Sequence, residues 1–462
     1  MKKIIGFIVL LIPFFALSQS ITIQPFGSGV NEHPDIGRGN IRDMFVDTMD
    51  NSLYAVGDFV QMGGKMVYGV AKWDGIAWDS LGSGIREFEW FDGIQHVDYV
   101  TKYKNEIYIS GAFYKCGRKT IWGIARWNGT EWNDVGGSMK GYYPSGGQME
   151  VYNNELYLIG RFDTIGNIPS KGIAKWDGNT WTDLSQNFYQ GCYNDGLFSL
   201  IHYNNELYVG GNINCPFLGE RLSKRVGNTW VQVGPYITGD ARLNKLRIFQ
   251  NNLYIGGYFF AQDGNLDNSF MYYNGNNFFP TAGGILPSNV LDMIDYKNEL
   301  YVCGQINYAG FQPMNRTAKW TGTQWVNTGI VLQDNSNQLN TGQPECWIEY
   351  NNKLVIGGFF KAVNGVTASG IASIDFGGVS VNNLDKNSPF KLYPNPTNST
   401  FSLEIANFSN FKSVSIYNSL GQTLLQQKSP EKTFDVSNYA KGMYVVEVQT
   451  DKGISRQKLI VK

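Results

Sequence analysis

The amino-acid sequence predicts an all-β fold, with a seven-bladed β-propeller followed by a small C-terminal β-sandwich. Three observations support this prediction. One motif recurs seven times at a period of 46 to 54 residues, which is the size of a four-stranded propeller blade. Glycine accounts for 54 of 462 residues and aromatic residues for 15%, as expected of short strands and tight turns. About 70 residues at the C-terminus contain alternating apolar runs of their own.

The charge and histidine content argue against several classes of function. The 38 basic and 39 acidic residues nearly cancel, which disfavours a broad electrostatic surface for nucleic acid or anionic membrane. The three histidines, His33, His96 and His202, are too scattered to suggest a multi-histidine metal site. We therefore expect no metal, no cofactor and no nucleic-acid partner.

The first 18 residues are predicted to be a secretory signal peptide. Lys2 and Lys3 precede a mostly apolar run from Ile4 to Leu17, and small residues at Ala16 and Ser18 suit cleavage before Gln19. The run is shorter than the roughly 20 residues that a membrane span needs. No later stretch is long and apolar enough, so we expect no transmembrane segment.

The repeated unit contains two motifs that define the second, third and fourth strands of each blade. The first is Leu-Tyr-x-x-Gly-x-Phe, and its seven copies are marked by Gly57, Gly111, Gly160, Gly211, Gly257, Gly304 and Gly358. The second is Gly-Ile-Ala-Lys-Trp-Asp-Gly-x-x-Trp, in which Asp-Gly or Asn-Gly is predicted to form a type I′ hairpin. An apolar run before the first motif supplies the first strand, and it ends in Asn-rich turns that tolerate positive φ.

The seventh copy stops near Phe376 without a Trp-bearing fourth strand. The segment Phe26-Gly27-Ser28-Gly29-Val30 matches Leu81-Gly82-Ser83-Gly84-Ile85, which ends the fourth strand of the first copy. We therefore expect residues 20–28 to form the outer strand of the seventh blade and to close the ring. This places the propeller at residues 19–379. An open β-solenoid is the alternative, and it would not need the exchanged terminal strand.

The repeated Trp and Tyr residues are predicted to pack blade against blade, because they recur once per blade at fixed positions. Lys72, Lys175 and Lys319 alternate with these packed residues and are predicted to be solvated.

Candidate binding residues lie in the variable connections, because binding residues concentrate on loops held by a rigid scaffold. Insertions collect between the fourth strand of one blade and the first strand of the next. These loops carry Phe88, Trp90, Phe91, Tyr142, Tyr143, Phe188, Tyr189 and Tyr193. Such aromatic side chains can stack on sugars or anchor a protein, or they can fold back over the blades, and the sequence leaves both interpretations open.

A second candidate set is the residue that follows each motif glycine. One such residue per blade would surround the channel mouth, and the set is Asp58, Ala112, Arg161, Asn212, Tyr258, Gln305 and Phe359. Asp58 and Arg161 are the members that we expect to contact a polar ligand.

No catalytic constellation is visible in the sequence. The histidine content does not fit a copper oxidase, and nothing places Arg118, Arg161 and Arg316 together as a sialidase would require. There is no Ser-His-Asp signature, phosphate loop or metal-ligand cluster. The loop from Asp334 to Asn337 is interpreted as a turn rather than a calcium site.

Two of the five cysteines are candidates for a disulfide bond. Export permits disulfides, and Cys192 and Cys215 lie in loops that share one face of the predicted propeller. Cys303 falls within a second strand and is predicted to be a buried thiol.

The C-terminal segment, residues 391–462, follows a polar linker at residues 380–390. Its matching pieces include Leu392-Tyr393-Pro394-Asn395-Pro396, a strand and turn ending at Gly421, and Gly442-Met443-Tyr444. In order and spacing they resemble the type A C-terminal sorting domain of the type IX secretion system of Bacteroidota. That resemblance implies export across the outer membrane through the secretion machinery, usually with removal of the domain and with release or surface attachment.

The repeats resemble kelch and galactose-oxidase-like propellers in part, through the glycine pairs Gly210-Gly211, Gly256-Gly257 and Gly357-Gly358. Their two Trp positions are closer together than kelch repeats usually have. The sequence thus predicts a secreted or cell-surface binding module for a glycan or a protein. An extracellular glycan hydrolase or lyase acting at the channel mouth is the alternative, which a carboxylate pair on that face would favour. A structural part of the surface layer is a third.

Overall fold

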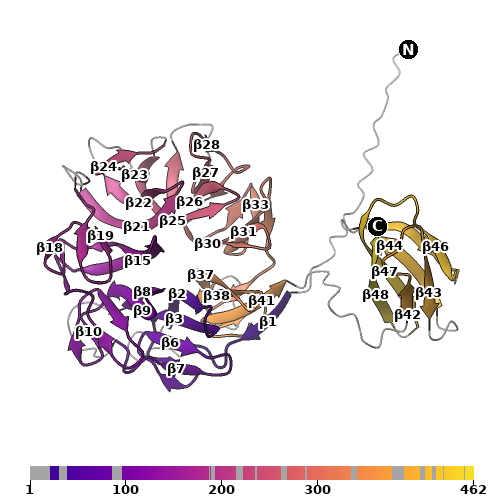
Figure 1. Ribbon diagram of the computed structural model, residues 1–462, viewed down its shortest axis with the longest axis horizontal. Coiled ribbons are helices and arrows are strands. Elements are labelled where there is room, and N and C mark those ends of the chain that lie inside the picture. The colour runs from indigo at the N-terminus through magenta and orange to yellow at the C-terminus, as the bar shows by residue number, and fades with distance from the viewer. Residues whose placement is uncertain are drawn as a thin grey trace, which may run out of the picture. The chain divides into compact units, whose positions relative to one another are not determined.

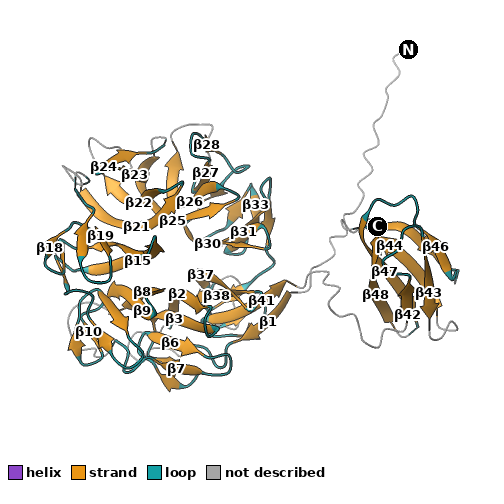
Figure 2. Ribbon diagram, in the orientation of Figure 1, coloured by secondary structure: helices purple, strands orange, loops and turns teal. Residues whose placement is uncertain are grey.

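A computed structural model describes residues 21–30, 39–85, 96–186, 188, 193–214, 222–234, 237–261, 268–286, 289–334, 341–376, 390–405, 411–418, 423–429, 431–451 and 453–462. Residues 20–376 form one compact unit, and residues 377–462 belong to a second. The described residues form strands and loops without a helix (Figure 2). The all-β prediction is therefore confirmed.

The larger unit contains seven antiparallel four-stranded sheets arranged around a common centre (Figure 1). The first sheet comprises β2 (Asn40–Asp47), β3 (Ser52–Asp58), β6 (Val70–Trp73) and β7 (Trp78–Ser80). The second comprises β8 (His96–Tyr103), β9 (Glu106–Ala112), β12 (Ile124–Trp127) and β13 (Trp132–Asn133). The third comprises β15 (Ser145–Tyr152), β16 (Glu155–Arg161), β19 (Ile173–Trp176) and β20 (Trp181–Asp183).

The remaining four sheets follow the same strand order. The fourth comprises β21 (Tyr193–Tyr203), β22 (Glu206–Asn214), β23 (Leu222–Val226) and β24 (Thr229–Gln232). The fifth comprises β25 (Ile237–Phe249), β26 (Asn252–Ala261), β27 (Phe270–Tyr273) and β28 (Phe278–Phe279). The sixth comprises β30 (Val290–Tyr296), β31 (Glu299–Gly304), β34 (Thr317–Trp320) and β35 (Trp325–Asn327). The seventh comprises β37 (Gln343–Tyr350), β38 (Lys353–Phe359), β41 (Ile371–Phe376) and β1 (Ile21–Pro25).

The turns within each sheet follow from their residues, with one correction. The Asn-rich turns have positive φ at both central positions, as at Asn153 (φ 48) and Asn154 (φ 62). The predicted type I′ hairpin at Trp-Asp-Gly is wrong, because a four-residue loop joins the paired Trp73 and Trp78. In that loop only Gly75 has positive φ, and the Asp74 carboxylate accepts hydrogen bonds from the next backbone amides.

The repeated aromatic residues connect neighbouring sheets. Five indole N–H groups donate to a backbone carbonyl of the preceding sheet's outer region at 2.6–3.0 Å, and they belong to Trp78, Trp132, Trp181, Trp230 and Trp325. Five tyrosine hydroxyls donate to the Asn-rich turn of the next sheet, and they belong to Tyr103, Tyr152, Tyr203, Tyr296 and Tyr350. The packing role predicted for these residues is confirmed.

The repeated lysines on the third strands are not simply solvated, which corrects the prediction. Lys72, Lys175 and Lys319 are 17–33% exposed, and each forms an ion pair at 2.8–2.9 Å with an acidic residue of its own sheet. The partners are Asp50, Glu155 and Glu299. Lys72 and Lys319 also lie over tyrosine rings of the second strands, so their stems cover aromatic surface.

The terminal strand β1 pairs with β41 from Ile21↔Phe376 to Pro25↔Ala372, as predicted from the missing fourth strand. The first and seventh sheets also contact each other along their inner strands β2 and β37. Trp78 donates to the Phe26 carbonyl at 3.0 Å, and Tyr350 donates to the Asn51 carbonyl at 3.0 Å. The bonds that join consecutive sheets elsewhere therefore also join the last sheet to the first.

Short hairpins between the second and third strands add further links at one end of the unit. They are β4–β5 (Gln61–Met62, Lys65–Met66), β10–β11 (Lys115–Cys116, Lys119–Thr120), β17–β18 (Thr164–Ile165, Ile168–Pro169), β32–β33 (Tyr308–Ala309, Gln312–Pro313) and β39–β40 (Ala362–Val363, Val366–Thr367). Three of them pair with a strand from the preceding inter-sheet connection: β14 (Met139–Lys140), β29 (Ile285–Leu286) or β36 (Leu332–Gln333). These hairpins were not predicted from the sequence, although a Gly or Asn six positions after the motif glycine marks them, as at Gly63 and Gly117.

The smaller unit has two sheets with a shared apolar core that includes Phe401, Val446 and Leu459. One sheet contains β42 (Phe390–Tyr393), β43 (Thr400–Ile405) and β46 (Thr433–Asp435). The other contains β45 (Thr423–Gln427), β44 (Phe411–Tyr417), β47 (Gly442–Thr450) and β48 (Gly453–Val461).

The residues of the proposed sorting motif lie along this unit. Tyr393 ends β42, Pro394 and Pro396 follow cis peptide bonds, and Asn395 lies between them. The Asn395 side chain bonds to the backbone of Lys458 and Ile460 in β48, so the motif is tied to the last strand.

Two further motif residues belong to β47. Gly442 begins that strand, and Tyr444 is buried with its hydroxyl donating to the Ala440 carbonyl at 2.6 Å. Gly421 lies outside the described residues. Within the part of the chain that the structure describes, no helix is long and apolar enough to cross a membrane.

Candidate functional site

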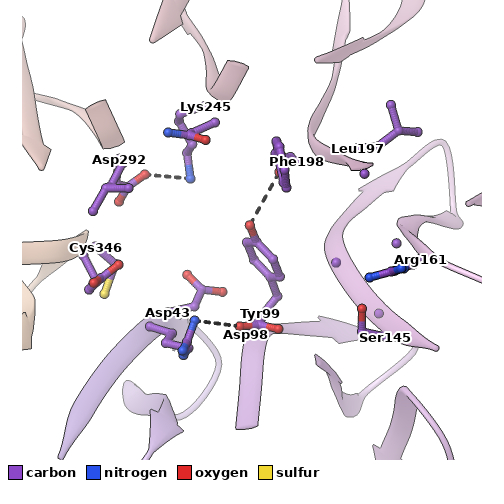
Figure 3. A pocket seen from close by; sticks show the side chains of 18 residues that line it. Asp43, Asp98, Tyr99, Ser145, Arg161, Leu197, Phe198, Lys245, Asp292 and Cys346 are labelled. Carbon is purple, nitrogen blue, oxygen red and sulfur yellow. Dashed lines mark hydrogen bonds and ion pairs between the residues drawn. The ribbon is translucent and has the colours of Figure 1, made fainter. Parts of the chain in front are cut away.

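A cavity of about 410 Å³ lies where the inner strands of the seven sheets converge (Figure 3). Its lining comes from the first strands of all seven sheets and from the end of β16. One sheet contributes Arg42 and Asp43, the next Asp98 and Tyr99, and others contribute Lys245, Asp292 and Glu345 among further residues. The site is thus built by many sheets together rather than by one loop.

A β-bulge in each first strand points one residue into this cavity. The register of every first strand shifts against its second strand at the same place in the repeat, which leaves a residue without a partner in the ladder. The bulged residues in the lining are Arg42, Asp98, Gly147, Phe198, Asn244, Leu291 and Glu345. The bulge therefore frees one position per sheet for variation while the rest of the repeat stays constant.

The bulge also explains the motif glycine. A Cβ atom built on any of the seven glycines would lie 1.9–2.4 Å from a backbone carbonyl oxygen of the facing first strand. At Gly57 that oxygen belongs to Asn40, and at Gly257 it belongs to Arg242. The bulged strand approaches so closely that only glycine fits.

The residue after the bulge joins one sheet to the next. Asp43 accepts a hydrogen bond from the Val100 amide at 3.0 Å, and Asp292 accepts one from the Trp347 amide at 2.7 Å. Gln148 and Ser199 do the same for the amides of Leu200 and Leu246. These side chains therefore hold neighbouring inner strands together, and Asp43 and Asp292 also border the cavity.

Most of the charges in the cavity are paired with one another. Arg42 bonds to Asp98 at 3.2 Å and to Asp58 at 2.9 Å. Lys245 lies 2.6 Å from Asp292, as Figure 3 shows. Fixed, oppositely charged pairs of this kind present hydrogen-bonding groups in set directions, which suits recognition of a polar molecule.

Two of the carboxyl groups in the cavity have a pKa above the usual range of such groups. Burial raises the pKa of Asp43 to about 7, against the opposing effects of Lys245 and the Val100 amide. Burial likewise raises the pKa of Glu345 to about 6, opposed by Arg42. Near pH 6 both groups bind a substantial share of protons and can then donate as well as accept hydrogen bonds.

We expect Asp43→Asn to stabilise the protein at alkaline pH. The pKa of Asp43 is raised above its ordinary value of 3.8, so burial disfavours its carboxylate and the stability that it contributes falls as pH rises from about 4 to about 7. The amide keeps an acceptor for the Val100 N–H and cannot ionise. Thermal unfolding at pH 8 should show a melting temperature higher by about 2 °C or more, with the difference shrinking toward pH 4.

The control for this prediction is Asp163→Asn, because Asp163 is exposed and lies outside the cavity lining. It should show no such pH-dependent difference. A constant difference between Asp43→Asn and the wild type from pH 4 to pH 8 would contradict the assignment.

The structure brings only part of the predicted ring of residues to the cavity. Of the residues that follow the motif glycines, Arg161 lies in the described lining and is exposed. Asp58 is not in the described lining, and its carboxylate accepts hydrogen bonds from the Nε and Nη2 atoms of Arg42. The described lining does not include Asn212, which is buried, or the exposed Tyr258 and Gln305.

The aromatic residues predicted on the loops differ in exposure. Phe188 folds back and is 1% exposed against Trp230, whereas Tyr142 and Tyr143 are 76% and 68% exposed and contact each other. Phe88, Trp90, Phe91, Tyr189 and the side chain of Tyr193 lie outside what the structure describes, so their role stays a prediction.

Three of the five cysteines lie among the described residues. Cys303 is a buried free thiol, as predicted, and Cys116 and Cys346 are buried free thiols too. Cys346 also borders the cavity. Cys192 and Cys215 lie outside the described residues, so the proposed disulfide stays a prediction. No group of three or more potential metal ligands occurs among the residues whose positions are described.

The bulged residues were not predicted from the sequence, although a signal for them exists. In six of the seven copies the bulged residue comes thirteen positions before the motif glycine, as from Asp98 to Gly111 or from Glu345 to Gly358. In two of these copies a charged residue, Asp98 or Glu345, interrupts an apolar strand there. That interruption is the pattern from which the cavity could have been inferred.

Comparison with known proteins assigns the C-terminal unit. Residues 391–462 match the family described as the secretion system C-terminal sorting domain. The protein is therefore secreted or displayed at the cell surface, and its C-terminal unit directs it to the type IX secretion machinery. No curated protein matches the chain.

Solved structures with a similar arrangement include extracellular proteins of Bacteroidota. One is the extracellular domain of the hybrid two-component system BT4673 from B. thetaiotaomicron, at 13% identity and a TM-score of 0.44, covering 96% of this chain and 58% of that one. Another is PorZ, a surface component of the type IX secretion system of Porphyromonas gingivalis, at 11% identity and a TM-score of 0.36, covering 92% and 66%. The chain thus spans less than two thirds of these proteins. The kelch resemblance and the signal peptide stay predictions.

Proposed function

We propose that residues 20–376 form a closed seven-bladed propeller that binds an extracellular saccharide in its central cavity. The pairing of β1 with β41 and the contacts between the first and seventh sheets support closure. The observation that supports binding is the cavity itself, into which each sheet directs one bulged residue of a different kind. Paired charges, an amide and an aromatic ring are the groups that sugar hydroxyls and sugar faces require.

Phe198 is the residue that supports a sugar rather than a small ion as the ligand. Its side chain is half-buried at the cavity wall, and its carbonyl accepts a hydrogen bond from the Tyr99 hydroxyl at 3.5 Å (Figure 3). A sugar ring can stack on such a ring while its hydroxyls bond to Asn244 and the charged residues.

A glycan array probed with the secreted protein, followed by calorimetry, tests this proposal. Phe198→Ala should weaken binding of a captured saccharide about tenfold, because a stacking contact contributes on the order of 1 kcal/mol. Tyr142→Ala is the matched control, since Tyr142 is an exposed aromatic residue outside the cavity lining. Loss of binding in Tyr142→Ala with Phe198→Ala unaffected would move the site to the exposed loops, where a protein partner is the better candidate.

Hydrolysis of a glycan is the second candidate, and the raised pKa of Glu345 favours it. Against it, each carboxyl group in the lining already bonds to a protein group: Asp43 and Asp292 to backbone amides, Asp98 to Arg42, and Glu345 to Gln343 at 2.9 Å. Binding is therefore the better-supported function. Release of reducing sugar from a captured glycan, abolished by Glu345→Gln, would reverse that preference.

A further inference from the structure

One cation of the cavity has no ionic partner among the described residues. Arg161 ends β16, where its backbone pairs with Ser145, and it is exposed and borders the cavity. Its guanidinium group makes no hydrogen bond or ion pair with any residue that the structure describes. The other two cations of the lining differ from it, because Arg42 is paired with Asp58 and Asp98, and Lys245 is paired with Asp292. Figure 3 shows Arg161 across the cavity from Lys245 and Asp292.

The wall around Arg161 contains several small residues beside Leu197 and Phe198. Ser145, Gly146, Gly147, Gly160 and Gly196 line the cavity on this side. Gly147 occupies the bulged position, where the other six sheets carry a side chain. A Cβ atom there would meet the Ile159 carbonyl oxygen at 3.0 Å, a tight contact that a shift of a few tenths of an ångström would relieve, unlike the overlaps at the motif glycines. The absence of a side chain keeps space open beside the guanidinium group.

The Arg161 guanidinium group supplies a cation, and the glycine-containing wall beside it leaves space for an anion. A guanidinium group presents a planar fork of donors that matches the oxygen atoms of a carboxylate or a sulfate. An anion in a partly enclosed cavity interacts with such a cation more strongly than it would in water. The lining also holds four carboxyl groups. Asp98 and Asp292 are paired with Arg42 and Lys245, and burial raises the pKa of Asp43 to about 7 and that of Glu345 to about 6, which reduces their negative charge. We therefore expect the preference for an anion to be strongest at or below about pH 6.

We infer that the ligand of this cavity is an acidic saccharide, whose carboxylate or sulfate group binds Arg161 in the glycine-lined sector. The inference rests on the proposed saccharide-binding function and specifies the class of sugar. The neutral hydroxyls of the ligand face the paired charges, and its acidic group faces Arg161.

Calorimetry on the full secreted chain tests the inference with four probes. They are trigalacturonate, its carboxyl-reduced analogue, a sulfated galactan oligosaccharide and its desulfated form. We expect the wild type to bind at least one acidic probe ten or more times more tightly than its neutral counterpart. Arg161→Ala should remove this preference and leave the affinity for the neutral form within about twofold.

Two further variants separate charge, geometry and folding. Arg161→Lys keeps the charge without the planar fork and should restore only part of the preference. Arg118→Ala is the matched control, because Arg118 is exposed on the β10–β11 hairpin outside the cavity lining, and it should behave as the wild type. Unchanged melting temperatures establish that each variant is folded.

The outcomes distinguish the inference from the proposed function. Equal binding of acidic and neutral probes by the wild type would overturn the inference and leave saccharide binding intact. An Arg161→Ala variant that weakens both forms equally would also overturn it. Binding of none of the four probes, together with an empty glycan array, would reject the proposed function and the inference with it.

Discussion

Gly57→Ala is expected to unfold the protein or to lower its stability by more than about 4 kcal/mol. The new Cβ would lie 2.0 Å from the Asn40 carbonyl oxygen and 3.0 Å from the Ile41 Cα. Both atoms belong to backbone that is fixed by the β2–β3 ladder and the bulge, so the clash cannot be relieved by rotating a side chain. Chemical denaturation, or the yield of folded protein where none remains to denature, measures the effect.

Gly227→Ala is the control for this prediction. Gly227 has a φ of +60°, and a Cβ atom there would have no other atom within 4 Å, so its substitution adds only backbone strain of about 1 kcal/mol. If Gly57→Ala cost no more than Gly227→Ala, the close approach of the bulged strand would not be the reason for the motif glycine.

Phe26→Ala is expected to lower the stability by about 3 to 5 kcal/mol, the usual cost of removing a buried aromatic side chain. Phe26 is 6% exposed and contacts Trp73, Trp78 and Tyr350, and it follows the strand that pairs with β41. Loss of this side chain weakens the joint between the first and seventh sheets. The freed edge of β41 should then promote association between chains, visible as concentration-dependent light scattering on heating.

Thr22→Ala tests whether the effect is specific to that joint. Thr22 lies in the same strand and is exposed, so its substitution should change stability by less than about 0.5 kcal/mol. A Phe26→Ala variant as stable as Thr22→Ala would mean that the terminal strand contributes little to holding the sheets together.

The fold was predictable because the same sequence motifs recur in every sheet of the larger unit. The motif at Leu53-Tyr54 and its copies fix the second strand of every sheet, and the Trp pairs fix the third and fourth. The missing fourth strand near Phe376 pointed to the N-terminal segment, and Ile21–Pro25 pairs there. Seven copies average out local irregularities, so a single poor match such as Phe278 in place of Trp does not obscure the pattern.

The site was less predictable because it is made of the positions where the copies differ. Arg161 was identified because it follows a motif glycine, but Asp58, at the matching position, turns to hold Arg42 instead. Whether a side chain enters the cavity depends on a bulge in another strand, which leaves only a displaced charge such as Asp98 or Glu345 in the sequence. The loop residues Phe88, Trp90 and Phe91 stay predictions.

The position of β41 has a mechanical consequence for a protein attached through its C-terminal unit. Phe376 ends β41, and the chain continues from there toward residues 391–462. Because β41 is paired with β38 on one side and β1 on the other, a force applied at Phe376 along the axis of β41 loads two antiparallel ladders in shear. Many hydrogen bonds must then break together rather than one after another, so the larger unit is suited to bear tension transmitted from a tethered end.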